Sequence, residues 1–355
     1  MKLHTPLTRL VGIEHPVVQT GMGWVAGARL VSATANAGGL GILAAATMTI
    51  DELANAIAKV KAATDKPFGV NIRADATDAG DRVELMIREG VKVASFALAP
   101  NQELIARLKE AGSVVVPSVG AAKHARKVAA WGADAVIVQG GEGGGHTGPV
   151  ATTLLLPSVL DVLAGKDIPV IAAGGFFDGR GLAAALSYGA AGVAMGTRFL
   201  LTTDSTVPDA VKQQYLQSAL DGTVVSTRGD GNPHPVLRTR RVEKLESGSK
   251  VRGFTAAVVN AAKFKKMSQM SWASMVRDGL AMRHGKDLTW SQVLMAANTP
   301  MLLKAGLVDG NTGAGVLASG QVAGIIEDLP SCAQLIESIV ADAIKHLQTA
   351  AALIE

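Results

Sequence analysis

Short runs of apolar residues alternate with amphipathic stretches over the first 200 residues of the chain. Eight of these runs are apolar at nearly every position, which is typical of parallel strands that are buried on both faces. The predicted strands span residues 17–19, 39–43, 68–72, 91–96, 114–117, 135–138, 169–172 and 192–195. The stretches between them show the 3.6-residue period of a helix with one apolar face. The predicted helices span residues 28–37, 50–63, 81–89, 102–111, 121–131, 154–163 and 179–188.

Strands that alternate with helices indicate a parallel α/β sheet, and eight such units are the number found in a TIM barrel. A doubly wound open sheet is the alternative that the same alternation allows. The pattern stops near residue 201 and gives way to stretches that predict helices and loops. We therefore predict a TIM (β/α)8 barrel made of residues 1–205 and 300–355, with a mostly helical insertion at residues 206–299.

The predicted insertion is strongly basic. Between residues 208 and 286, fourteen Lys or Arg stand against six Asp or Glu, an excess of eight positive charges in a chain whose net charge is only +4. Four of the eleven methionines also lie here, including Met267, Met270 and Met275 near Phe264 and Trp272. This composition predicts a lid that receives a polyanionic, partly apolar substrate. A solvated helical face above an ordinary core is the alternative.

The remaining composition excludes several classes of protein. A chain of 355 residues that is 48% hydrophobic can bury a large core, and its single cysteine, Cys332, excludes an internal disulfide framework. No signal-peptide pattern and no membrane-spanning apolar run is visible, so we expect a cytoplasmic protein. No histidine pairs with a carboxylate at a metal-ligand spacing, and no nucleic-acid-binding motif is present.

A glycine-rich turn follows the sixth predicted strand and carries His146. In a TIM barrel the active site lies at the carboxyl ends of the strands, so a histidine there is a candidate general acid or base. Glu142, in the same turn, is expected to be a loop carboxylate. Other candidate site residues at predicted strand ends are Gly21, Met22, Gly23, Trp24, Asn71, Ser118, Gln139, Gly144, Gly145 and Ala173.

The ends of the seventh and eighth predicted strands carry a pattern that is typical of phosphate binding. Gly174 and Gly175 follow strand seven, and Gly196 and Thr197 follow strand eight. Barrels commonly bind phosphate through backbone N–H groups after these two strands, where a Cβ atom would hold the ligand away.

Six ordered motifs together resemble the nitronate monooxygenase (formerly 2-nitropropane dioxygenase) family. They include Gln19-Thr-Gly-Met-Gly-Trp, Gly141-Glu-Gly-Gly-Gly-His-Thr-Gly and Met195-Gly-Thr-Arg-Phe, with the others at residues 37–41, 68–71 and 173–180. The resemblance covers residues 1–205 and, more loosely, the segment around Ser319 and Gln321. It implies a TIM barrel that holds FMN without a covalent bond.

By that resemblance, the backbone at residues 21–23 lies beside the isoalloxazine ring, and Asn71 and Gln139 contact the flavin or its ribityl chain. Gly174, Gly175, Gly196 and Thr197 would hold the phosphate, and Ser319 and Gln321 would approach from the C-terminal segment. His146 matches the active-site histidine of the family. The flavin would supply the redox chemistry, and the protein would position it.

Several reactions remain open, because the same scaffold serves nitronate oxidation, NADH:quinone reduction and reduction of enoyl thioesters. The basic insertion favours a coenzyme A thioester, with Trp24, Arg240 and Arg241 as substrate contacts. The whole-chain pattern, including residues 304–330, also resembles actinobacterial flavin reductases of steroid C/D-ring acyl-CoA degradation. We therefore expect NAD(P)H-dependent reduction of an unsaturated, steroid-derived acyl-CoA. Nitronate oxidation by O₂, quinone reduction, a barrel that has lost its flavin, and a homodimeric state stay open.

Overall fold

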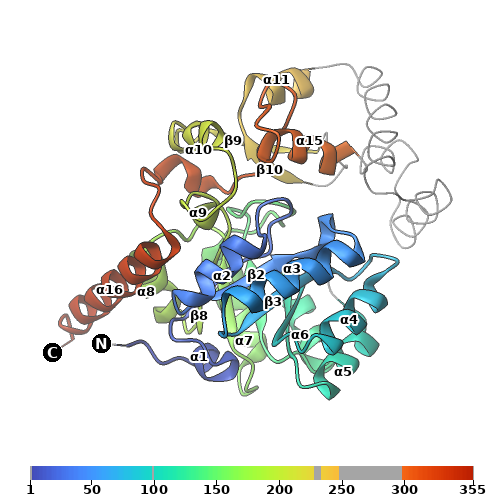
Figure 1. Cartoon of the computed structure of the whole chain (residues 1–355). Helices are drawn as coiled ribbons and strands as arrows, with labels where there is room; N and C mark the ends of the chain where they lie inside the picture. Colours follow the sequence, from blue (N-terminus) through green and yellow to red (C-terminus); the bar gives the residue numbers. More distant parts are fainter. Residues whose placement is uncertain (1, 98–99, 228–232, 248–297, 355) are drawn as a thin grey trace.

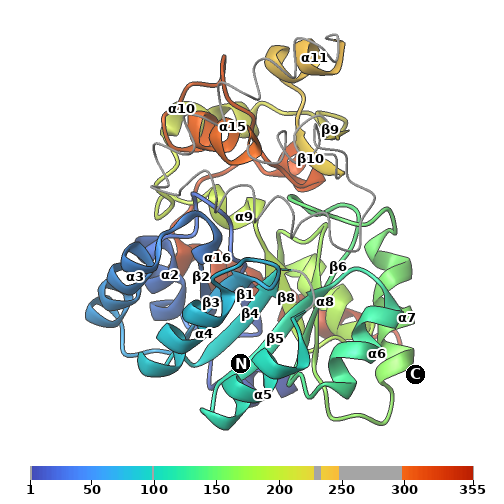
Figure 2. The ribbon, with the colours of Figure 1, turned by 90° about the vertical axis from the view of Figure 1, so that its right-hand side faces the viewer.

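The computed structural model describes residues 2–97, 100–227, 233–247 and 298–354. Eight parallel strands pair in sequence order and close into a barrel, since β1 pairs with both β2 and β8. The prediction of a TIM barrel is confirmed (Figures 1 and 2). The strands are β1 (Val17–Gln19), β2 (Leu40–Ala44), β3 (Phe68–Arg73), β4 (Val93–Ala97), β5 (Val114–Val119), β6 (Val136–Gln139), β7 (Val170–Ala173) and β8 (Gly192–Met195).

A helix connects each barrel strand to the next, as the periodicity predicted. These helices are α2 (Ala28–Asn36), α3 (Ile50–Ala63), α4 (Ala79–Arg88), α5 (Gln102–Glu110), α6 (Ala122–Ala130), α7 (Thr152–Leu163) and α8 (Gly179–Ser187). The local sequence fixes several of their starts. In α3, for example, Thr49 and Glu52 form a reciprocal capping box. Shorter elements that the pattern did not predict are α1 (Pro6–Val11), η1 (Ala45–Thr47) and α9 (Thr197–Leu200).

Side chains along each strand point alternately into the barrel and toward the surrounding helices, which gives an inner and an outer apolar layer. One buried cluster consists mainly of strand residues that point into the barrel, including Val18, Ile42, Val116 and Ile171, and it also contains Leu7 and Val11 of α1. Two larger clusters lie between the strands and the surrounding helices. The interior of the barrel is therefore filled by side chains below its carboxyl-terminal end, which leaves only that end for a ligand.

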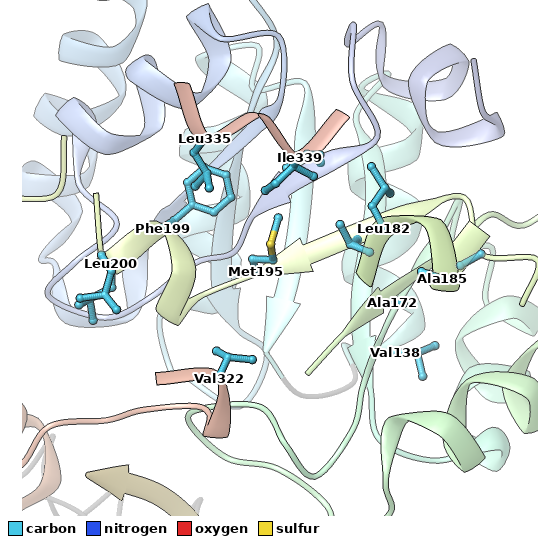
Figure 3. Close-up of a cluster of buried hydrophobic side chains, with 14 of the residues drawn as sticks. Val138, Ala172, Leu182, Ala185, Met195, Phe199, Leu200, Val322, Leu335 and Ile339 are labelled. Carbon is cyan, nitrogen blue, oxygen red and sulfur yellow. The ribbon is translucent and has the colours of Figure 1, made fainter. Parts of the chain in front are cut away.

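The last helix, α16 (Cys332–Ala351), packs on the outside of the barrel against α8 and α2 (Figure 1). Figure 3 shows Leu335 and Ile339 of α16 in one buried cluster with Met195 of β8 and Phe199 of α9. Val322, from the short helix η2 (Gln321–Ile325), belongs to the same cluster. The C-terminal segment is thus anchored to the end of strand β8.

The segment after β8 forms a separate layer over the carboxyl ends of the strands (Figures 1 and 2). Its described elements are α10 (Asp209–Leu216), β9 (Thr223–Ser226), β10 (His234–Leu237), α11 (Arg240–Ser247) and α15 (Asn298–Leu307). Beside its helices, this segment contains two short strands that the sequence pattern did not predict, because β9 and β10 form a two-stranded antiparallel sheet. The strand pattern is weak since β9 is only partly buried and β10 contains a proline.

Much of the predicted lid cannot be compared with the structure. Its methionines and aromatic residues, Met267, Met270, Met275, Phe264 and Trp272, lie outside the described residues. So do nine of its basic residues: Arg228, Lys250, Arg252, Lys263, Lys265, Lys266, Arg277, Arg283 and Lys286. The boundaries at residues 205 and 300 stay a prediction.

β10 attaches the upper layer to the C-terminal segment. The amide of Leu237 donates to the carbonyl of Leu317 at 2.9 Å, and the amide of Ser319 donates to the carbonyl of Pro235 at 3.1 Å. Tyr215 of α10 is fully buried, and its hydroxyl donates to the carbonyl of Ala318 at 2.7 Å. Burial raises the pKa of Tyr215, so the hydroxyl stays protonated and remains a donor. Among the described residues, no helix is both long and apolar enough to cross a membrane.

We expect Tyr215→Phe to lower the free energy of unfolding by about 1 kcal/mol, because the hydrogen bond from the buried Tyr215 side chain to the carbonyl of Ala318 would be lost. Chemical denaturation followed by circular dichroism measures the change. The matched control is Tyr188→Phe, since the chain has only two tyrosines and Tyr188 is 46% exposed. Equal stability of the two variants would contradict a stabilising role for this hydrogen bond.

Candidate functional site

Polar side chains ring the inside of the barrel at the carboxyl ends of four neighbouring strands. Asn71 of β3, Ser95 of β4, Ser118 of β5 and Gln139 of β6 all lie at inward-facing positions. Asn71 is in register with Ser95, and its Nδ2 donates to the Ser95 hydroxyl at 3.1 Å. None of the four carries a charge, so the ring offers hydrogen bonds without the cost of burying an ion.

Ser95 was not predicted as a site residue from the sequence, although Asn71, Ser118 and Gln139 were. Ser95 is 1% exposed and is the only polar residue in a short apolar strand. A single polar residue at an inward position of a buried strand was the available signal. Its alignment with Asn71 depends on the pairing register of β3 and β4, which the local sequence does not reveal.

The loop after β1 lies against this ring. A Cβ added to Gly21 would be 2.5 Å from the Cβ of Asn71, and one added to Gly196 would be 3.4 Å from the sulfur of Met22. The glycines therefore allow the loop to pack directly on the ends of β3 and β8. Gly23 packs in the same way near Thr47.

Trp24 ends this loop in a left-handed conformation, with φ of 66°, which is uncommon for a residue with a side chain. Its indole N–H donates to the carbonyl of Pro300 in α15 at 3.1 Å. Trp24 thus connects a barrel loop to the upper layer, 276 positions away in the chain. This contact places it at the rim of the mouth, in keeping with its predicted position, while its predicted contact with substrate stays untested.

The β6–α7 loop, residues 140–151, carries His146. At its base, the Gln139 amide donates to the carbonyl of Gly144 at 2.9 Å. The Glu142 carboxylate accepts from the amide of Thr152 at 3.0 Å and from its hydroxyl at 2.7 Å. Glu142 therefore compensates the free N–H groups at the start of α7, which is the structural role expected of it.

The segment of residues 319–321 joins this loop to strand β8. The amide of Gly320 donates to the Thr197 hydroxyl at 2.9 Å, and the amide of Gln321 donates to the carbonyl of Glu142 at 3.0 Å. Gly144 lies so close that a Cβ there would be 2.9 Å from the Gly320 nitrogen. The structure thus brings together Gly144, Thr197, Ser319 and Gln321, four residues that the sequence placed in one site.

Gly174 and Gly175 form a glycine cradle after β7. Both have positive φ angles, 93° and 83°, that residues with side chains rarely adopt. A Cβ on Gly174 would lie 3.0 Å from the carbonyl oxygen of Gly140 and 3.1 Å from the Thr152 hydroxyl. Ala173, the last residue of β7, is buried and accepts the amide of Gly140 at 3.0 Å. Glycine is therefore required at Gly174, because a side chain there would collide with the start of the β6–α7 loop and with Thr152.

His146 is exposed and meets a second histidine from the upper layer. Its ring lies edge-to-face with that of His234 in β10, with centroids 5.1 Å apart and planes at 83°. His234 is only 8% exposed. Gly145, next to His146, has a φ of 75°. Sequence reasoning did not single out His234, because the contact joins two segments that are far apart in the chain.

Arg240 and Arg241, the predicted substrate contacts, belong to the upper layer. They lie on α11, where they line a pocket of about 450 Å³ that is also lined by α10 and residues 312–313. Arg198, directly after Thr197, is nearly buried and pairs with Asp328 at 2.6 Å. Burial lowers the pKa of this guanidinium, while Asp328 acts in the opposite direction. Within the described ranges, no three His, Cys, Asp or Glu residues are grouped to bind a metal ion.

Comparison with known proteins agrees with this arrangement. The model of the nitronate monooxygenase family matches residues 4–342. The chain belongs to the nitronate monooxygenase family. Membership of this family and the dehydrogenase activity in the name of a relative show that the chain is an oxidoreductase.

Two relatives share one printed activity, (3aS,4S,5R,7aS)-5-hydroxy-7a-methyl-1-oxo-octahydro-1H-indene-4-carboxyl-CoA dehydrogenase. The protein from Mycobacterium tuberculosis (strain ATCC 25618 / H37Rv) is 84% identical over the full length of both chains. The protein from Rhodococcus jostii (strain RHA1) is 70% identical over 99% of each chain. Among solved structures, FabK from Thermotoga maritima matches with a TM-score of 0.82 and 34% identity, over 99% of this chain and all of that one.

We expect Gly174→Ala to lower the amount of flavin that co-purifies with the protein several-fold. The matched control is Gly165→Ala, because Gly165 also has a positive φ of 75° but has nothing within 4 Å of an added Cβ. Both variants incur the backbone cost of about 1 kcal/mol, and only the first crowds the cradle. The flavin-to-protein absorbance ratio after desalting measures the difference. Equal ratios in the two variants would contradict a cofactor role for this turn.

Proposed function

We propose that the chain is an FMN-dependent oxidoreductase that acts on a coenzyme A thioester of a steroid-derived bicyclic acid. The observation that carries the proposal is the barrel mouth itself, where a neutral polar ring, a glycine cradle and the loop of His146 lie at the same ends of the strands. The family consists in general of flavoproteins, and two relatives at 84% and 70% identity carry the name of an acyl-CoA dehydrogenase.

The residues present fit FMN. Gly174, Gly175 and Gly196 offer backbone amides that no Cβ covers, which suits a phosphate. The Thr197 hydroxyl accepts from Gly320, so its own proton is free to be donated to that phosphate. Asn71 and Gln139, with amide groups fixed by Ser95 and Gly144, would contact the polar edge of the ring system.

When bound, FMN supplies hydride exchange with the carbon β to the thioester carbonyl. The chain then has to handle the proton at the α carbon. His146, an exposed imidazole at the mouth, is the side chain that we propose takes or gives this proton. It can equally donate a hydrogen bond to the thioester carbonyl and so stabilise the charge that develops on its oxygen.

The names of the two relatives favour a direction. A dehydrogenase removes a hydride and a proton from its substrate, whereas the sequence led us to expect reduction of an unsaturated thioester. The two reactions are the same chemistry in opposite directions. We therefore propose dehydrogenation of a saturated acyl-CoA, with NAD(P)⁺ as the acceptor that would take the two electrons from the reduced cofactor, and NAD(P)H as the donor when the reaction runs in the opposite direction.

An anaerobic titration tests the proposal. We expect a saturated acyl-CoA with a bicyclic acyl group to bleach the flavin absorbance of the purified protein. NADH and NADPH are added separately, because bleaching by either one would identify the nicotinamide co-substrate. Bleaching by an alkyl nitronate alone, with no response to any thioester, would overturn the proposal in favour of nitronate oxidation.

We expect His146→Gln to lower kcat for the thioester about a hundredfold or more without changing the flavin content. The matched control is His124→Gln, since His124 is an exposed histidine on α6. Stopped-flow measurement of flavin reduction gives the rate directly. A rate that is unchanged in His146→Gln would show that another group moves the proton.

A further inference from the structure

The charged side chains that line the pocket beside α11 are all positive in the part of the chain that the structure describes. Arg240, Arg241 and Lys244 contribute three cations, and no Asp or Glu occurs in the lining that the structure describes. Neutral donors complete it, since Gln214 of α10 donates to the Thr312 hydroxyl at 2.9 Å and both residues line the pocket. At about 450 Å³, the pocket is the size of a small-molecule site.

The sequence of α11 separates its charges. An α-helix turns by about 100° per residue, so Arg240, Arg241 and Lys244 fall within about 100° of its circumference. Glu243 and Glu246 fall on the other side. Glu246 accepts from Ser226 of β9 at 2.5 Å, which directs that carboxylate toward the small sheet. The positive face of the helix therefore borders the pocket without local neutralisation.

One of the cations has an unmet hydrogen-bonding capacity. The Nε atom of Arg241 is buried and has no hydrogen-bond partner among the described residues. A buried guanidinium nitrogen without an acceptor is costly, and a ligand with anionic oxygens would remove that cost. Thr239, at the start of α11, also lines the pocket, and its hydroxyl accepts the amide of Val242.

A short stretch of chain connects this pocket to His146. His234, whose ring meets His146, begins β10, and Arg240 follows six residues later. Six extended residues span at most about 20 Å. The pantetheine arm of coenzyme A has about thirteen bonds between its sulfur and the diphosphate, equal to a little over four extended residues, or about 15 Å. A thioester at His146 therefore brings the nucleotide end of the same molecule within reach of the pocket.

We propose that this pocket binds the 3′-phosphorylated adenosine end of coenzyme A. The inference rests on the proposed function, because it takes the substrate to be a coenzyme A thioester. The three cations match a phosphate monoester, which carries nearly two negative charges at neutral pH. Gln214 and Thr312 supply neutral hydrogen bonds to the sugar or base.

Calorimetric titration of the flavin-loaded protein with coenzyme A and with dephospho-coenzyme A, which lacks the 3′-phosphate, tests the inference. We expect coenzyme A to bind about tenfold more tightly or better. The variant Arg240→Gln with Lys244→Gln should reduce this ratio to within about twofold, and high salt should reduce it in the unmodified protein. Both residues are exposed, so the double variant is expected to fold normally.

The matched control is Lys123→Gln with Arg126→Gln, which removes two exposed cations from α6 on the barrel wall. The control should keep the full ratio. Equal binding of the two ligands by the unmodified protein, or an unchanged ratio in the Arg240/Lys244 variant, would overturn the inference. A variant that instead loses preference for NADP⁺ over NAD⁺ would assign the pocket to a nicotinamide nucleotide.

A truncated N-acetylcysteamine thioester separates this inference from the proposed function, because it has no nucleotide. If it is turned over equally by the unmodified protein and the Arg240/Lys244 variant, the proposed function stands and the binding ratio alone decides the pocket. If no thioester reacts with the flavin, the proposed function fails. The titration with coenzyme A still reports whether the pocket recognises the 3′-phosphate.

Discussion

The site depends on two backbone hydrogen bonds made by residues 319–321. One joins the C-terminal segment to Thr197 at the end of β8, and the other joins it to Glu142 in the β6–α7 loop. Glu142 in turn accepts hydrogen bonds at the start of α7, and the Thr152 hydroxyl of α7 lies 3.0 Å from the carbonyl oxygen of Gly174. Three strand ends are thereby fixed against one another. A site that must position a flavin needs this rigidity, since small displacements of a catalytic group are costly.

Charge is distributed so that the barrel mouth and the upper layer have different tasks. The ring at the mouth consists of amides and hydroxyls. The β6–α7 loop beside it contains two titratable side chains, Glu142 and His146. The cations of α11 stand apart, in a pocket of their own. This division suits a substrate with an uncharged reacting end and a polyanionic handle. In the proposed reaction, the neutral end would meet the redox cofactor, and the handle would supply binding energy at a distance from the chemistry.

The upper layer also accounts for how a shared family barrel could serve a particular substrate. The barrel supplies the cradle and the polar ring, whereas β10 and α15 bring His234 and the carbonyl of Pro300 to its rim. Trp24, which has a left-handed backbone conformation, is one of the barrel residues that contact this layer. Strain at a rim residue is typical of a position that the surrounding structure must fix for function.

The sequence by itself determined the barrel, its eight strands and most residues of the mouth, because strand and helix periods are local and the carboxyl ends of parallel strands must meet. It could not predict the sheet of β9 and β10, because β9 is only partly buried and β10 contains a proline, so neither strand shows a strong period. Nor could it find Ser95 or His234, because each matters only through a partner on another element. Tertiary structure alone decided that Arg240 and Arg241 share a pocket with α10 and residues 312–313. The physical reason is that contacts between segments distant in the chain depend on packing, which no local pattern encodes.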